Sequence, residues 1–264
     1  MFGKLFGGKA RKAKLDEAFG NYQALSSQER FAEAEPFAAE VLELGREEFG
    51  SQSQNTAVFA NNLAMVLKAQ GKFADAEPLY EEALAIQEKV LSPDHPELAN
   101  SLNNLAALYK DQEKYGDAEA FYKRSLAIRE AAFGPDHPDV GTSLNNLASL
   151  YDAQDTYEEA KPLYMRCLDI SEIAFGKEHP EAALSLNNLA VLYKDQGKFD
   201  EAEPLMQRAL AIMEKAQGPD DSHTVMILEN LVELLRQAGR GDEAAEMEAR
   251  VRAGPSLDNH VKSG

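Results

Sequence analysis

The sequence predicts an all-α chain built from about six copies of a helix-turn-helix unit. The prediction rests on a constant internal period, apolar residues at helical spacing within each copy, and the lack of β-branched segments with strand-like alternation. The period is clearest in the motif Asn-Asn-Leu-Ala. Its copies lie 42 residues apart and begin at Asn61, Asn103, Asn145 and Asn187. A decayed fifth copy begins at Glu229 and keeps the same step.

The first helix of a unit is typified by residues 97–110, where the apolar side chains between Leu98 and Tyr109 fall on one side. A His-Pro-acid motif precedes it in three copies, which places a capping residue, a proline and a carboxylate at the helix start. We interpret these histidines as caps rather than metal ligands. Neighbouring helices lie at least about 8–10 Å apart, whereas metal ligands lie about 2 Å from one ion. The histidines are His95, His137 and His179.

The second helix is typified by residues 116–133, and Gly71 and Gly197 are expected in the tight turn between the two helices. Neither helix can bury its apolar stripe alone, so neighbouring units must stack as an α-solenoid. The predicted units are 15–56, 57–98, 99–140, 141–182, 183–224 and 225–253. An N-terminal arm (1–14) and a C-terminal tail (254–264) flank them.

Composition excludes several classes of function. The net charge of −18 disfavours binding to nucleic acid, which needs a basic surface. The single cysteine, Cys167, rules out a disulfide framework or a cysteine-based zinc site, and we interpret it as a small buried hydrophobic residue. The sequence lacks a membrane span, a secretory signal, and the common catalytic and cofactor motifs. We therefore expect a cytoplasmic, non-enzymatic protein without a cofactor or metal.

Charge is distributed unevenly along the chain. Residues 1–14 carry five basic side chains and no acid, which leaves a net −23 on the rest. Glycines at positions 3, 7 and 8 oppose a helix, so we expect this arm to be flexible. Two alternatives are contact with an anionic membrane surface through Phe2, Leu5 and Phe6, and docking onto the acidic body.

The repeat resembles a known family. Leu63-Ala64 followed by Ala76, Tyr80 and Ala83 matches the tetratricopeptide pattern. The 42-residue period, Leu-Asn-Asn-Leu-Ala and the segment "GPDHP", with "SPDHP" and "GKEHP" at equivalent positions, resemble the kinesin light chain subgroup. The resemblance implies a right-handed superhelix whose first helices line a concave groove that binds extended peptide segments. A motor-cargo role is not carried over, because the heptad coiled coil of kinesin light chains is missing here.

Helix geometry places an asparagine ladder opposite the buried stripe. With Leu102 at 0° and 100° per residue, Asn104 falls near 200° and Asn103 flanks it. An amide both donates and accepts, so the ladder suits a peptide backbone whatever its side chains. The alternative is that these amides bridge neighbouring helices. The predicted peptide-binding residues are Asn62, Asn104, Asn146, Asn188 and Asn230, with Asn103, Asn145 and Asn187 beside them.

A flanking position carries basic residues in four of five copies, with Asp152 in the remaining one. These residues either pair with acidic groups of a partner or with neighbouring acids such as Asp111 and Asp195. The first interpretation favours an acidic partner. The basic residues are Lys68, Lys110, Lys194 and Arg236.

The sequence thus predicts an adaptor or scaffold that binds an extended protein segment in its groove. The alternative is a regulatory or assembly subunit that acts through self-association or on a partner enzyme. The partner's identity and the oligomeric state stay open.

Overall fold

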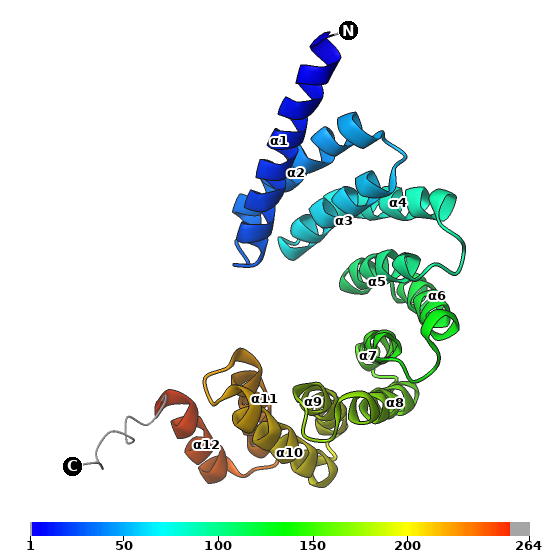
Figure 1. Ribbon diagram of the computed structural model, residues 1–264. Helices are drawn as coiled ribbons and strands as arrows, with labels where there is room; N and C mark the ends of the chain where they lie inside the picture. Colours follow the sequence, from blue (N-terminus) through cyan, green and yellow to red (C-terminus); the bar gives the residue numbers. More distant parts are fainter. Residues whose placement is uncertain (1, 254–264) are drawn as a thin grey trace, which may run out of the picture. The chain divides into compact units, whose positions relative to one another are not determined.

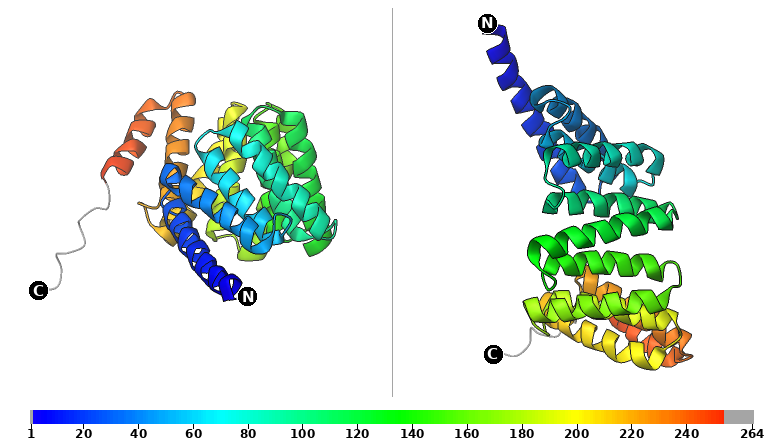
Figure 2. Two further views of the ribbon diagram at one scale, coloured as in Figure 1. Left: turned by 90° about the horizontal axis from the view of Figure 1, so that it is seen from above. Right: turned by 90° about the vertical axis from the view of Figure 1, so that its right-hand side faces the viewer.

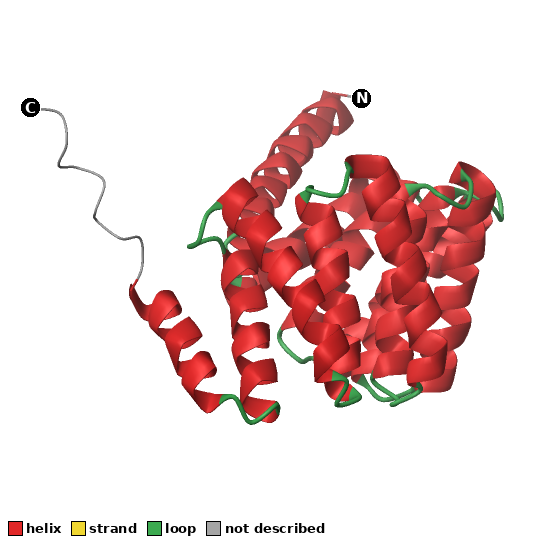
Figure 3. Cartoon of the chain, turned by 90° about the horizontal axis from the view of Figure 1, so that it is seen from below, coloured by secondary structure: helices red, strands yellow, loops and turns green. Residues whose placement is uncertain are grey.

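The computed structural model describes residues 2–253, which form helices joined by short loops and contain no strand (Figures 1 and 3). This confirms the predicted all-α helical repeat, while the tail 254–264 lies outside the described residues. The helices are α1 Phe2–Ser26, α2 Phe31–Phe49, α3 Gln54–Ala69, α4 Phe73–Val90, α5 Pro96–Asp111, α6 Tyr115–Phe133, α7 Pro138–Asp152, α8 Tyr157–Phe175, α9 Pro180–Asp195, α10 Phe199–Gln217, α11 Ser222–Gln237 and α12 Gly241–Ala253.

The chain divides into two compact units, Met1–Ala132 and Phe133–Gly264. Within the first, α1 packs on α2 and α3 on α4, and α2–α3 and α4–α5 contacts join successive pairs. The second repeats the scheme with α7–α8 and α9–α10, joined by α8–α9 and α10–α11 contacts. Within each unit the helix pairs stack as layers (Figure 2). Leu98, Leu102 and Leu105 are fully or almost fully buried on α5, as the predicted stripe requires.

The predicted histidine caps are confirmed. Nδ1 of His95 accepts the backbone N–H of Glu97 at 3.2 Å, and the same bond recurs at the start of α7 and α9. In the second unit, Phe133 and Phe175 also stack on the capping rings of His137 and His179, with centroids 4.6 and 5.0 Å apart. Each of these rings therefore caps one helix and contacts the end of the helix before it.

The turn inside each helix pair has a left-handed residue at the same position of the 42-residue register. Gly71, Gly197 and Gly239 occupy it with φ between 71° and 76°. Glu113 and Asp155 adopt the same conformation with φ of 59° and 55°. An L-residue in this region is strained by about 1 kcal/mol or more relative to glycine. The two glycines predicted in the turns are thus favoured there by the backbone conformation, although other residues can adopt it at a cost.

Replacing Gly197 with alanine is expected to lower the free energy of unfolding by about 1 kcal/mol. An added Cβ meets no atom within 4 Å, so backbone strain is the only cost. Gly20→Ala is the matched control. Gly20 lies within α1 with equally open surroundings, and alanine should stabilise the helix there by up to about 1 kcal/mol. Urea denaturation measures both, and the same sign for the two would contradict the explanation.

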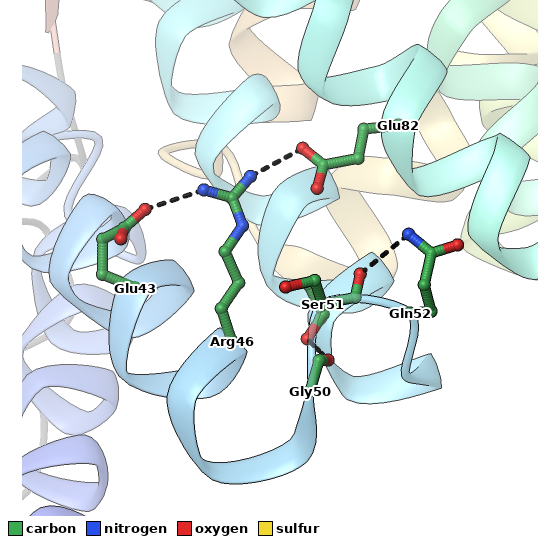
Figure 4. A network of polar contacts seen from close by, with 7 residues as sticks. Glu43, Arg46, Gly50, Ser51, Gln52 and Glu82 are labelled. Carbon is green, nitrogen blue, oxygen red and sulfur yellow. Dashed lines mark hydrogen bonds and ion pairs between the residues drawn. The ribbon is translucent and has the colours of Figure 1, made fainter.

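Arginine–glutamate ion pairs join successive second helices. Arg46 on α2 contacts Glu43 of its own helix and Glu82 of α4, both at 2.7 Å (Figure 4). Two further pairs bridge α4 to α6 and α8 to α10 at 2.5 and 2.8 Å, namely Glu88–Arg124 and Glu172–Arg208. These partly exposed pairs each contribute little to stability, at most about 1 kcal/mol.

A second set of contacts links some of the second helices to the turn of the next helix pair. Glu35 accepts from Gln70 at 2.8 Å and from Lys72 at 2.5 Å, and these hydrogen bonds lower the pKa of its carboxyl group. The same arrangement recurs in the next repeat, where Glu77 accepts from Gln112 at 3.0 Å and from Lys114 at 3.1 Å. On α8 the position equivalent to Glu35 is occupied by Lys161. Its Nζ lies over the ring of Tyr193 on α9, 5.3 Å from the ring centroid. The step from α8 to α9 therefore departs from the repeat pattern.

The N-terminal segment differs from the prediction of a flexible arm. Helix α1 begins at Phe2, well before the predicted first unit at residue 15. Leu15, Ala18 and Tyr22 are buried, so packing anchors the later turns, and the preceding residues extend the helix without a second nucleation step. Arg11 forms ion pairs with Glu47 at 3.1 Å and with Glu48 at 3.7 Å. At this residue the arm docks onto the acidic body, the alternative that the charge distribution raised.

Candidate functional site

The second asparagine of each pair is half-buried on the first helix of its layer. This holds for Asn62 and Asn104 in the first unit and for Asn146, Asn188 and Asn230 in the second. The preceding asparagine is more deeply placed in two pairs, with Asn103 7% and Asn187 3% exposed. The amides at the second position are therefore within reach of a ligand.

The amides also bond to one another across layers of the second unit. Asn188 donates its Nδ2 to Oδ1 of Asn145 at 2.7 Å, and Asn230 donates in the same way to Asn187 at 3.0 Å. The first asparagine of one layer thus orients the second asparagine of the next. Because each bond uses one N–H, the donating amide keeps its carbonyl oxygen and its other N–H for a ligand. Both interpretations of the ladder have a structural basis.

In the first unit the arrangement is different. Asn61 donates to the hydroxyl of Ser101 at 2.7 Å, instead of accepting from Asn104. The face around Asn62 is partly apolar, because Val58 and Met65, one turn on either side of it, are 40% and 42% exposed. This surface combines amide and hydrophobic groups.

The predicted basic residues are mostly engaged with acids of the chain. Lys68 pairs with Asp111 at 2.7 Å, and Arg236 with Glu248. Lys194 is only 6% exposed, because it lies between Asp195 at 3.6 Å and Glu233 at 2.8 Å. Its hydrogen bond and charge lower the pKa of Glu233. Lys110 is half-buried and also has an interaction partner. These contacts correspond to the second interpretation, pairing within the chain.

A pocket of about 370 Å³ lies between α7 and α9 with α8 behind it, entirely within the second unit. The bonded pair Asn145 and Asn188 forms part of its wall. Apolar lining comes from Ile170, Phe175 and Leu184. The pocket was not predicted, although it adjoins the asparagines that were.

Cys167 also lines this pocket and is 8% exposed, which confirms its prediction as a small buried residue. Its Sγ lies 3.6 Å from Oγ of Ser185. Burial raises the pKa of the thiol, so the neutral form is favoured.

Within residues 2–253, no group of three or more His, Cys, Asp or Glu side chains is arranged to hold a metal ion. None of the helices in this range has both the length and the apolar composition needed to cross a lipid bilayer.

Stacked helix pairs that repeat along the chain define an α-helical repeat protein. The tetratricopeptide repeat family matches the sequence in overlapping segments at 22–89, 55–131, 111–173, 153–215 and 181–254. The chain belongs to the tetratricopeptide repeat family. Members of this family are typically non-enzymatic scaffolds that mediate protein–protein interactions.

Solved structures with a similar fold include kinesin light chain-like repeat proteins. A kinesin light chain-type protein of Podosopora anserina with nearly identical TPR-like repeats is 25% identical, with a TM-score of 0.66 over 80% of this chain and 97% of that one. BtubC (BKLC) from P. vanneervenii shares the fold at 24% identity and a TM-score of 0.67, covering 97% and 96% of the two chains. An assembly chaperone of RpL4, Acl4, shares it at 17% identity and a TM-score of 0.61, covering 92% and 91%. No curated protein matches the chain.

Proposed function

We propose that this protein is a non-enzymatic adaptor that binds an extended segment of a partner protein along the first helices of its layers. The observation that carries the proposal is the recurrence of a half-buried asparagine at one register position of α3, α5, α7, α9 and α11. A side-chain amide can both donate to and accept from the N–H and C=O groups of an extended backbone.

The inter-layer hydrogen bonds support this role. A ligand contact is strongest when the contacting group is already oriented, because less side-chain entropy is lost on binding. Asn188 and Asn230 are held by Asn145 and Asn187, and each retains unused amide capacity.

Changing Asn104, Asn146 and Asn188 together to alanine is expected to weaken binding of a selected peptide by at least about tenfold, since each backbone hydrogen bond contributes about 0.5–1.5 kcal/mol. Peptides selected on the wild-type protein from a library of random nine-residue sequences serve as ligands, and isothermal titration measures affinity. Asn55→Ala, an exposed asparagine at the start of α3, is the control and should leave affinity unchanged. Equal affinity of the triple variant and the wild type would refute the proposed role of the amides.

A regulatory or assembly subunit that self-associates is the second candidate. The observation favouring it is Ile173, which is 74% exposed on α8 with Met165 46% exposed two turns earlier on the same side. Sedimentation velocity over a range of concentrations distinguishes the two, because the adaptor needs no self-association through this surface. A dimer that Ile173→Ser abolishes would favour this alternative.

A further inference from the structure

The pocket between α7 and α9 exists because two positions that face each other, one on α8 and one on α9, both carry small residues. Along the 42-residue register, the position of Ser171 is occupied by Gly45, Gln87, Arg129 and Met213 in the other copies. Its counterpart on the next first helix is Ser185, and the two hydroxyl oxygens face each other at 3.2 Å.

Other steps place a bulky side chain at one of the two positions. Gly45 is covered by the ring of Phe59, which stands at the position equivalent to Ser185. Met213 is 2% exposed, and the position that faces it is occupied by Ile227. Gly141 enlarges the pocket further, because alanine, valine or leucine stands at its position in the other copies. Small residues at both facing positions thus distinguish the α8–α9 layer from the two layers compared here.

The lining of the pocket is both apolar and acidic. Asp139 and Glu181 line it together with Ile170, Leu184 and Phe175, and no Lys, Arg or His belongs to the lining. Within the wall, the Ser185 hydroxyl donates to the Glu181 carbonyl, and the Ser171 hydroxyl lies within donating distance of the Leu168 carbonyl and of Oγ of Ser185. A long aliphatic stem with a cationic end suits such walls, since apolar surface contacts the stem and carboxylates attract the charge.

We infer that this pocket receives one lysine or arginine side chain of the bound partner, an inference that rests on the proposed function. The volume of about 370 Å³ accommodates a single long side chain with room to spare. The net charge of −18 favours the approach of a basic segment. An acidic partner, by contrast, would have to break the ion pairs of Lys68, Lys194 and Arg236.

The test is selection of random nine-residue peptides on the full chain, followed by titration of a selected peptide and of its citrulline or norleucine counterpart. The wild type is expected to enrich lysine or arginine at one peptide position. Removing the charge from that side chain should weaken binding by about tenfold or more, and the peptide should protect Cys167 from a small thiol reagent.

Variants of the protein locate the effect. Ser171→Met, which copies Met213, should abolish the enrichment, whereas Gln87→Met introduces the same residue at the equivalent position outside the pocket and should preserve it. If Ser171→Met folds poorly, Gly141→Ala narrows the pocket gently, because its Cβ would lie 3.5 Å from Ile170. Glu181→Gln should remove the preference for charge, and Glu97→Gln, the same repeat position in the first unit, should not.

The outcomes separate the two proposals. The pocket inference would be overturned if the selected peptides showed no enrichment of basic residues, if they were enriched in acidic residues, or if basic enrichment survived both Ser171→Met and Gly141→Ala. Each of these outcomes would leave the adaptor proposal intact. Failure to select any peptide would instead overturn the adaptor proposal, and the pocket inference with it.

Discussion

Leu186→Ala is expected to lower the free energy of unfolding of the second unit by about 2–5 kcal/mol. Leu186 is fully buried on α9 in a cluster that also contains Met206 of α10 and Leu228 of α11. Removing its branched end loses the transfer free energy of the side chain and leaves a cavity shared by three helices. The effect is large because every layer is stabilised mainly by its immediate neighbours.

Hydrogen exchange measures this change helix by helix, and the loss of protection should be greatest in α9, α10 and α11. Ile173→Ala is the control. It removes a side chain of similar size that is 74% exposed, and should change stability by no more than about 0.5 kcal/mol. Equal losses in the two variants would show that the α9–α11 cluster is not the source of the stability.

Gly45→Ala is expected to destabilise the first unit by about 1–3 kcal/mol, although alanine is the better helix former. Gly45 lies within α2, and an added Cβ would stand 2.3 Å from Cδ2 and 2.6 Å from Cε2 of Phe59. The ring cannot turn away easily, because Phe19 and Phe49 lie against it with centroids 6.0 and 6.3 Å away.

A double-mutant cycle with Phe59→Ala isolates this clash. Without the ring the Gly45→Ala change should no longer destabilise the protein and should gain up to about 1 kcal/mol from helix propensity. Urea denaturation of the four proteins provides the measurement. Additive effects would mean that the Phe59 ring does not cause the strain.

Much of the fold could be predicted because its signals are local and repeated. The typical first and second helices, predicted as 97–110 and 116–133, were found as Pro96–Asp111 and Tyr115–Phe133. The histidine caps and turn glycines followed from backbone hydrogen bonding and conformation, which a few neighbouring residues determine. The N-terminal helix was missed, because its glycines indicate helix propensity alone and not the packing that anchors the later turns.

The candidate site was only partly predictable. The asparagine face followed from helical geometry, but the partners of its amides depend on the spacing between layers, which no single helix determines. The same limit applies to Lys194, whose burial results from Glu233 on α11. The pocket did leave a signal in the sequence: Ser171 and Gly141 are smaller than most of their equivalents. That signal indicates a pocket only because residues 171 and 185 face each other, and the sequence alone does not reveal this pairing.

The facing pair that opens or fills the space between layers also gives the scaffold a simple form of modularity. Gly45 with Phe59 and Ser171 with Ser185 occupy the same positions of the 42-residue register, yet a ring fills the first space and a pocket lies at the second. Under the proposed function, two side chains in each repeat would determine where along a ligand a side chain can enter. Paralogues could move or multiply such positions by point substitutions alone, and so diversify their ligands while keeping a common frame.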